Sequence, residues 1–513
     1  MPETAGTDEY RAQESNPLTD AEAPDLRHLF RHGFIYLAGA VGTQLIGFFL
    51  IPLYTHYLTP ADYGILEILD RGLGALGVLG GLGLARAVVR YYFEQIDDDY
   101  RRRVLATGSL TILVSALGVA ALIAALSPWL SVLLLKTPRY AGLVALMAFG
   151  MGLDVAAGLP MAAMRAREQS SAFITFSLIR LLMGVGLNIW FLAGLHLGLV
   201  GIIYSSLIMN LVTGAALFVL LLRDSGLRFD RTIQRDMLRF GAPIAPAGIP
   251  VLALHYGDRF MLQRLASNAV VGVYSLGYRF GSVLGTLINN PFGLVWDPYM
   301  YKVAHRPSAG RIYGRVLTYH QVITMAAALC LTLLASDLIR LMADPKYWGA
   351  TGLVGPVAFG YAVFGAYNVT YSGIVIKKKT VWLLALSTAA ALVNIGANLL
   401  LIPRMGAMGA AVATLISFAW LTVTTGVISQ RKLPVAYEAG RLFHLYLIVG
   451  VCLAAGLLLP RAAPGADIWL RVGVLAAFPF LLMITGFPTA DERVALRGLR
   501  DRALGRSKPG PRA

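Results

Sequence analysis

The chain has 513 residues, of which 57% are hydrophobic and only 14% are charged. A soluble globular protein carries about 25% charged residues, so the composition excludes an ordinary soluble domain and predicts a polytopic membrane protein. The formal charge of +16 does not indicate a nucleic-acid partner, because Lys and Arg accumulate in the cytoplasmic loops of membrane proteins. The cysteines, Cys330 and Cys452, lie in different apolar segments and suggest neither a disulfide framework nor a metal site.

Residues 1–30 are polar and acidic on balance, and we expect them to form a disordered cytoplasmic tail. A secretory signal needs a basic start, a short apolar core and a small-residue cleavage site. This segment shows none of these features. The first apolar segment is therefore predicted to stay in the protein as a helix.

Apolar runs of about 20 residues, the length that crosses a hydrocarbon core of about 30 Å, recur along the rest of the chain. They predict an all-α membrane protein with about fourteen transmembrane helices. Most of the 44 Lys and Arg residues fall in the connections on one side, which predicts that this side and both termini are cytoplasmic. The expected spans are 33–57, 63–84, 104–126, 141–164, 170–194, 199–222, 241–263, 269–295, 312–335, 351–375, 381–402, 406–428, 442–460 and 468–487.

Two halves of the sequence match at an offset of 208 residues, which aligns Gly33 with Gly241 and Arg71 with Arg279. Each half holds an even number of helices, so both enter the membrane the same way. This predicts two six-helix lobes related by a pseudo-twofold axis along the membrane normal, followed by a terminal helix pair. The expected regions are the tail (1–30), an N-lobe (31–222), an amphipathic cytoplasmic linker (223–240), a C-lobe (241–430), helices 13 and 14 (431–487) and a basic cytoplasmic tail (488–513).

A first group of charges lies in the second and eighth spans. Glu67 and Arg71 are spaced to pair on one helix face, with Asp70 beside them. The repeat places Arg279 at the position equivalent to Arg71, without an acid next to it in the sequence. Charges in spans usually face a partner or a wet cavity, and a guanidinium binds phosphate oxygens through two hydrogen bonds. We therefore predict a cavity that binds substrate through these residues; a purely structural ion pair is the alternative.

Asp154 and Arg180 flank the cytoplasmic turn at Arg167 by 13 residues each. An antiparallel hairpin sets them at similar depth, which predicts a buried structural ion pair between the fourth and fifth spans. Loss of one partner would leave an uncompensated charge at low dielectric.

His255, Asp258 and Arg259 form a third group, in the seventh span. A carboxylate near an imidazole could carry coupling protons or bind a cation. Capping and pairing with Arg259 explain the group nearly as well, so both interpretations stay open.

Several predicted spans contain prolines. Proline removes a backbone hydrogen bond and bends a helix, so these residues predict breaks in the helices. Such breaks often mark the moving parts of transporters, and a static kink is the alternative. Glycines at 277, 281 and 285 predict a helix-packing face. The hinge candidates are Pro52, Pro246, Pro250 and Pro291.

Three stretches carry a family resemblance: FFLIPLYTHYLTPADYGILEI from Phe48, GDRFMLQRLASNAVVGVYSLGYRF from Gly257 and NIGANLLLIPRMGAMGAAVATLIS from Asn394. They resemble the polysaccharide-transport branch of the multidrug, oligosaccharidyl-lipid and polysaccharide exporter superfamily. The resemblance covers about residues 30–430 and implies a flippase for polyprenyl-pyrophosphate-linked oligosaccharides with a cationic central cavity. In that family the first, second, seventh and eighth helices line the cavity, and Arg71 and Arg279 fall on two of these.

The resemblance implies a bacterial inner-membrane protein of polysaccharide assembly whose partners are a lipid-linked oligosaccharide, membrane lipids and other assembly proteins. We expect no cofactor, no metal and no catalytic residue; coupling to an H⁺ or Na⁺ gradient or to the membrane potential stays open. A drug or cation exporter of the same fold and a non-transporting subunit of a polysaccharide synthase are the alternatives. An enzyme is disfavoured because the outer loops are all short.

Overall fold

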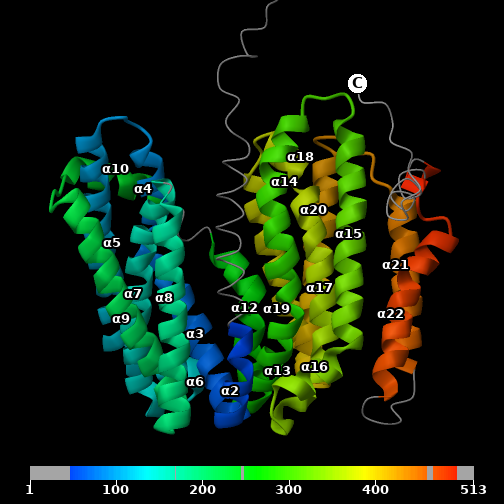
Figure 1. Cartoon of the computed structure of the whole chain (residues 1–513), viewed down its shortest axis with the longest axis horizontal. Coiled ribbons are helices and arrows are strands. Elements are labelled where there is room, and N and C mark those ends of the chain that lie inside the picture. Colours follow the sequence, from blue (N-terminus) through cyan, green and yellow to red (C-terminus); the bar gives the residue numbers. More distant parts are fainter. Residues whose placement is uncertain (1–46, 168, 244–247, 459–465, 491, 494–513) are drawn as a thin grey trace, which may run out of the picture.

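The computed structural model describes residues 47–167, 169–243, 248–458, 466–490 and 492–493. These residues form two helical lobes side by side, with a further helix pair beside the second lobe (Figure 1). Every regular element in the described ranges is helical. The predicted tail 1–30, the beginning of the first span and most of the tail 488–513 lie outside the described residues.

The N-lobe is built from long apolar helices joined by short connections. A 3₁₀ turn (Pro138–Tyr140) precedes α7, and a π turn (Trp190–Gly194) follows α8. Its helices are α2 (Ile51–Tyr57), α3 (Pro60–Gly81), α4 (Leu84–Tyr92), α5 (Asp98–Ala125), α6 (Ser127–Leu135), α7 (Ala141–Ala166), α8 (Ser170–Ile189) and α9 (Gly198–Ser225).

The C-lobe follows an amphipathic helix, α10 (Arg231–Gly241), and the terminal pair consists of α21 (Ala439–Leu458) and α22 (Ala466–Ile484). A π turn (Gly285–Asn289) interrupts the eighth span, and a 3₁₀ helix (Pro345–Ala350) precedes α17. The C-lobe helices are α12 (Ile249–Leu265), α13 (Asn268–Gly281), α14 (Asn290–Val303), α15 (Ala309–Leu333), α16 (Ala335–Met342), α17 (Thr351–Thr370), α18 (Ser372–Ile376), α19 (Val381–Met405) and α20 (Ala407–Gln430).

The element order repeats at the offset seen in the sequence. The short helices α6 and α16, which the sequence did not predict, begin at Ser127 and Ala335 and follow equivalent long helices. In the N-lobe α7 packs against α3, α5 and α9, and in the C-lobe α17 packs in the same way against α13, α15 and α20. The prediction of two related six-helix lobes is confirmed.

Helix length and composition agree with a membrane location. Ten helices of the described residues are long and apolar enough to cross a membrane. The other predicted spans correspond to α2, α12, the interrupted α13–α14 and α22. The predicted fourteen-helix, all-α architecture is therefore confirmed in its arrangement, with a break in the eighth span that Asn289, Asn290 and Pro291 had indicated.

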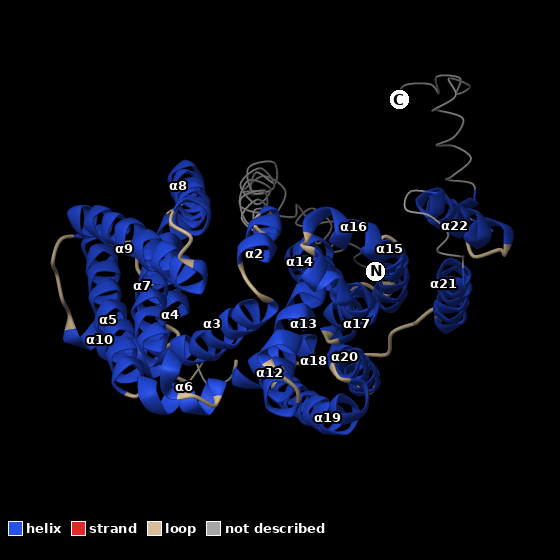
Figure 2. Ribbon diagram, turned by 90° about the horizontal axis from the view of Figure 1, so that it is seen from below, coloured by secondary structure: helices blue, strands red, loops and turns tan. Residues whose placement is uncertain are grey.

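The lobes are joined where α3 crosses α13 (Figure 2). A Cβ atom at Gly64 would lie 1.9 Å from the carbonyl oxygen of Asn268, and one at Gly272 would lie 1.9 Å from that of Pro60. Only glycine allows so close an approach of two backbones. Both contacts transform into each other under the repeat offset, so the crossing lies on the pseudo-twofold axis.

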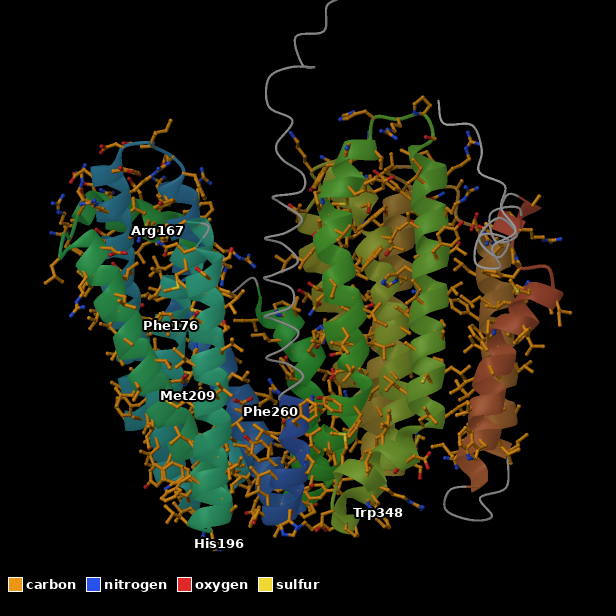
Figure 3. All side chains as sticks on the ribbon, viewed as in Figure 1. Arg167, Phe176, His196, Met209, Phe260 and Trp348 are labelled. Carbon is orange, nitrogen blue, oxygen red and sulfur yellow. The ribbon has the colours of Figure 1, made fainter. Side chains whose placement is uncertain are left out.

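The lobes approach each other at the end where α2, α3 and α13 lie and diverge toward the end that carries α10 (Figure 1). Arg167 lies toward the α10 end of the N-lobe and His196 at the opposite end (Figure 3). The amphipathic helix α10 buries Ile233 and Met237 against α4 and α5. The predicted glycine face at 277, 281 and 285 is also confirmed. These glycines pack against α17 and against Ala350, the residue that precedes α17.

Candidate functional site

Glu67 occupies the centre of the charged group between the lobes. This carboxylate on α3 is only 6% exposed. Its Oε2 lies 3.3 Å from Nε of Arg71 and 3.7 Å from Nε of Arg259, and its Oε1 lies 3.8 Å from Nη2 of Arg279. One N-lobe acid thus holds three arginines, two of which come from the C-lobe helices α12 and α13.

This geometry changes the interpretation of Arg279. The sequence shows no acid beside Arg279 and therefore predicts no ion-pair partner for it. The structure supplies Glu67 from the opposite lobe, because the α3–α13 crossing brings the two helices together. Arg71 also lies 3.5 Å from Asp70, whose side chain is 56% exposed.

Arg259 is the arginine that sequence reasoning assigned to another group. Its Nη1 donates to Asp258 over 2.9 Å, and its guanidinium lies 4.2 Å from the centre of the Tyr278 ring. Asp258 is fully buried and also accepts hydrogen bonds from the hydroxyls of Tyr274 and Thr414. Arg259 therefore reaches the central cluster, whereas Asp258 is held inside the C-lobe.

His255 lies apart from Asp258 in its contacts. Its Nδ1 is 3.3 Å from the hydroxyl of Tyr361, and its ring packs against Phe364 and Phe418. Among the described residues, no hydrogen bond joins it to Asp258. Arg259 Nη1 donates both to Asp258 and to the backbone carbonyl of His255, and a coupling role for either residue stays a prediction.

A cavity of about 440 Å³, the C-lobe cavity, opens beside this cluster. Three guanidiniums and one carboxylate line it, a formal charge of +2. Aromatic and amide side chains complete its wall. Its charged lining residues are Glu67, Arg71, Arg259 and Arg279, and its uncharged lining residues include Tyr256, Tyr278, Asn289, Tyr361, Phe364 and Asn368.

Two donors of the cluster lack hydrogen-bond partners. Nη1 of Arg279 and Nε of Arg259 are buried, and neither donates a hydrogen bond to any described residue. Buried donors are nearly always satisfied in folded proteins. Glu67 therefore does not satisfy all donors of the guanidiniums around it, and an anion that displaces this carboxylate can bind them.

A second cavity of about 530 Å³, the N-lobe cavity, lies between α3, α7, α8 and α9 and shares Gly47, Glu67 and Arg279 with the C-lobe cavity. It carries three carboxylates against two guanidiniums, a formal charge of −1. Its polar lining residues include Tyr54, Glu67, Asp70, Asp154, Arg180, Asn188, Asn210 and Arg279.

Asp154 and Arg180 lie in an ion pair between α7 and α8, at 2.5 Å between Oδ1 and Nη2. The same Nη2 donates to Asn210, which in turn donates to the carbonyl of Gly150. The expectation that this pair is buried was wrong, since the Asp154 side chain is 55% exposed. Both residues line the N-lobe cavity, so the pair forms part of its wall.

The hinge candidates lie at helix starts. Pro52, Pro250 and Pro291 each occupy the first turn of α2, α12 and α14, where a missing N–H costs nothing. Pro291 directly follows the π turn of the eighth span. Pro246 lies outside the described residues, and a hinge role for any of these prolines stays a prediction.

Sequence reasoning missed the C-lobe side of the site. Tyr361, Phe364 and Asn368 all line the C-lobe cavity from α17, and the hydroxyls of Tyr361 and Tyr278 are 3.0 Å apart. Their spacing of three and four residues places them on one helix face. A search for polar and aromatic residues at this spacing within apolar spans would have indicated them.

The helices of the described residues define a multi-pass, all-helical membrane protein. The fold is similar to that of the lipid II flippase MurJ in its inward closed conformation, with a TM-score of 0.67 and 15% identity over 87% of this chain and 98% of that chain. It is also similar to an inward-facing multidrug resistance MATE family transporter of the MOP superfamily, with a TM-score of 0.63 and 14% identity over 78% and 97% of the two chains.

Residues 29–304 match the model of the family described as "Polysaccharide biosynthesis protein". The match covers more than half of the chain, and the protein belongs to this family. No curated protein sequence matches the chain. The predicted membership of a polysaccharide family is confirmed, and the fold is similar to that of solved exporters and flippases.

Proposed function

We propose that this protein is an alternating-access flippase. It moves polyprenyl-pyrophosphate-linked oligosaccharide units from the cytoplasmic to the outer leaflet for the synthesis of O-antigen, capsule or exopolysaccharide. The observation that carries the proposal is the cluster of three arginines around Glu67, which gives the C-lobe cavity its positive charge. A pyrophosphate cannot enter hydrocarbon without compensating cations, and the guanidinium fork matches its oxygens.

The arrangement of the lobes supports a state open toward the cytoplasm. They are joined at the α3–α13 crossing and diverge toward the end predicted to be cytoplasmic (Figure 1). A lipid-linked headgroup would enter between the lobes from that end and reach the arginines. Release on the other side would require the crossing at Gly64 and Gly272 to separate, as alternating access between two repeats demands.

The cluster argues against the drug-exporter alternative. An organic cation needs an accessible acid, and Glu67, the carboxylate that lines the C-lobe cavity, lies within 4 Å of three guanidiniums. The accessible acids Asp70 and Asp154 line the N-lobe cavity instead, where a drug exporter would bind its cation. Asp258 is fully buried in its own network. The C-lobe cavity is therefore built for an anion.

We also propose that the protein lies in the bacterial cytoplasmic membrane, with both termini in the cytoplasm. Transport would use no cofactor and would couple to an H⁺ or Na⁺ gradient or to the membrane potential. Single cysteines at Asp62 and Asn268 should react with an impermeant label from outside the cell, while cysteines at Gln169 and Lys378 should be protected. Labelling of Lys378→Cys from outside would contradict this topology.

The proposed function is tested in a deletion strain and with the purified full-length protein. The strain should accumulate lipid-linked oligosaccharide repeats in the cytoplasmic leaflet, whereas loss of a synthase subunit without transport activity would leave them in the outer leaflet. Vesicles with the purified protein should bind and translocate polyprenyl pyrophosphate, and the Arg259→Ala/Arg279→Ala double variant should not.

A matched control is Arg471→Ala, which removes an arginine paired with Asp337 at 2.8 Å, away from both cavities of the site. This variant should translocate like the wild type. Normal glycan export by the double variant at normal expression would refute the cationic-cavity mechanism and favour a scaffold or exporter role.

A further inference from the structure

The N-lobe cavity is lined by carboxylates and amides that the proposed pyrophosphate site does not use. Its volume of about 530 Å³ falls within the range of about 300–1,000 Å³ found for ligand pockets. From this cavity we infer that the N-lobe wall is the glycan site and that it selects sugars without a negative charge next to the pyrophosphate. This inference rests on the proposed function and adds the class of sugar.

Adjacency supports the assignment. The two cavities share Gly47, Glu67 and Arg279. In a lipid-linked glycan the first sugar is bonded directly to the pyrophosphate, so the two sites must touch. A phosphate held by Arg279 therefore places the first sugar against α3, α7 and α8 of the N-lobe.

Charge decides which sugars fit there. The N-lobe cavity has a formal charge of −1, and its accessible carboxylates are Asp70 and Asp154, each more than half exposed. Arg180 is already engaged by Asp154 and Asn210. A uronic acid would bring its carboxylate toward these acids, and like charges placed together in an interface are strongly unfavourable. Hydroxyls and amines instead donate to carboxylates.

The amide groups of the wall are held in place before substrate arrives. Asn188 accepts a hydrogen bond from the Tyr54 hydroxyl and donates to the carbonyl of Gly184. Asn210 donates to the carbonyl of Gly150 and accepts from Arg180. Polar groups fixed by such contacts lose little conformational freedom on binding, which suits the recognition of hydroxyl groups.

The experiment measures binding of three probes to the purified full-length protein: polyprenyl pyrophosphate, polyprenyl-diphospho-N-acetylglucosamine and polyprenyl-diphospho-glucuronic acid. For the wild type, the glucuronic acid probe should bind about tenfold more weakly than the neutral one. In Asp70→Asn and in Asp154→Asn this ratio should fall toward one. In Asp154→Asn binding of the sugar-free probe should stay at the wild-type value, whereas Asp70→Asn, which removes a partner of Arg71, should bind that probe at least as tightly as the wild type. Asparagine can keep a hydrogen bond to Arg180, and Asp70→Asn provides a second variant that leaves the Arg180 pair intact.

The matched control is Asp224→Asn, an aspartate paired with Arg167 at 3.1 Å outside both cavities, which should keep the wild-type ratio. Equal wild-type affinities for the neutral and acidic sugars would overturn the inference, as would a loss of sugar-free binding in Asp154→Asn. The proposed function is tested independently of this inference. It is contradicted if the wild type does not bind polyprenyl pyrophosphate, or if Arg279→Ala binds it as tightly as the wild type.

Discussion

The two lobes share one helix plan, but their facing walls carry different chemistry. The repeat offset pairs Arg71 with Arg279, yet it pairs Glu67 with Ser275 and Asp70 with Tyr278. The acids that line the N-lobe cavity thus have uncharged counterparts in the C-lobe. The repeat is kept where the backbones pack and at the two arginines, and it is lost at the acids that face the N-lobe cavity. This difference allows one molecule to hold an anion and a neutral group side by side.

The packing symmetry is centred on the α3–α13 crossing, and breaking it should have the largest effect. Gly272→Ala adds a carbon 1.9 Å from a backbone oxygen of α3, so the helices must move apart. We expect a loss of about 3 kcal/mol of stability or more, measured as a lower Tm and a lower yield of folded protein.

The control for this substitution is Gly118→Ala on α5, where nothing lies within 4 Å of the added carbon. Its stability should stay within about 1 kcal/mol of the wild type, since alanine is the better helix former. Equal behaviour of the two variants would mean that the lobes are not joined through this crossing.

The second test removes Glu67, an N-lobe acid whose repeat-equivalent residue in the C-lobe, Ser275, is uncharged. Glu67→Gln leaves three guanidiniums without their shared carboxylate, and loss of one partner of a buried ion pair costs about 3 kcal/mol. The unliganded protein should therefore have a lower Tm. Because the Glu67 carboxylate no longer competes for the arginines, the variant should also bind polyprenyl pyrophosphate more tightly. Weaker binding would contradict the idea that this carboxylate occupies the place of the substrate's phosphate in the unliganded protein.

The repeat-equivalent arginines provide the third test. Arg279→Ala should abolish or severely reduce flipping, since hydrogen bonds to a charged group contribute about 1.5–3 kcal/mol each. Arg279→Lys should restore activity only in part, because a point charge cannot reproduce the fork. Arg71→Ala should be milder, because Glu67 and Asp70 both lie within 4 Å of Arg71. Transport is measured at matched expression levels, and a larger loss of flipping in Arg71→Ala than in Arg279→Ala would contradict the prediction.

The smallest effect is expected at the N-lobe ion pair. Asp154 is half exposed, so Arg180→Ala should lower stability by only about 1 kcal/mol. The exchange Asp154→Arg/Arg180→Asp should recover part of the folded yield. Failure of the exchange to recover stability would indicate that the hydrogen bond to Asn210 matters more than the ion pair itself.

Much of the fold follows from the sequence, because apolar length and the repeat offset are local properties of the chain. The spans, the two related lobes, the break near Pro291 and the Glu67–Arg71 pair could all be predicted in this way. A contact between residues four apart on one helix is set by helix geometry alone. The facing positions of Asp154 and Arg180 followed from the hairpin that joins their helices.

Only the tertiary structure decided which groups meet between the lobes. Glu67 reaches Arg259 and Arg279 because two glycines let α3 and α13 cross in close contact, and no local pattern contains that crossing. Burial was decided in the same way. Asp258 is enclosed by α13 and α20 while Asp154 faces a cavity, because exposure depends on which neighbouring helices cover a residue, and helical periodicity does not contain that information.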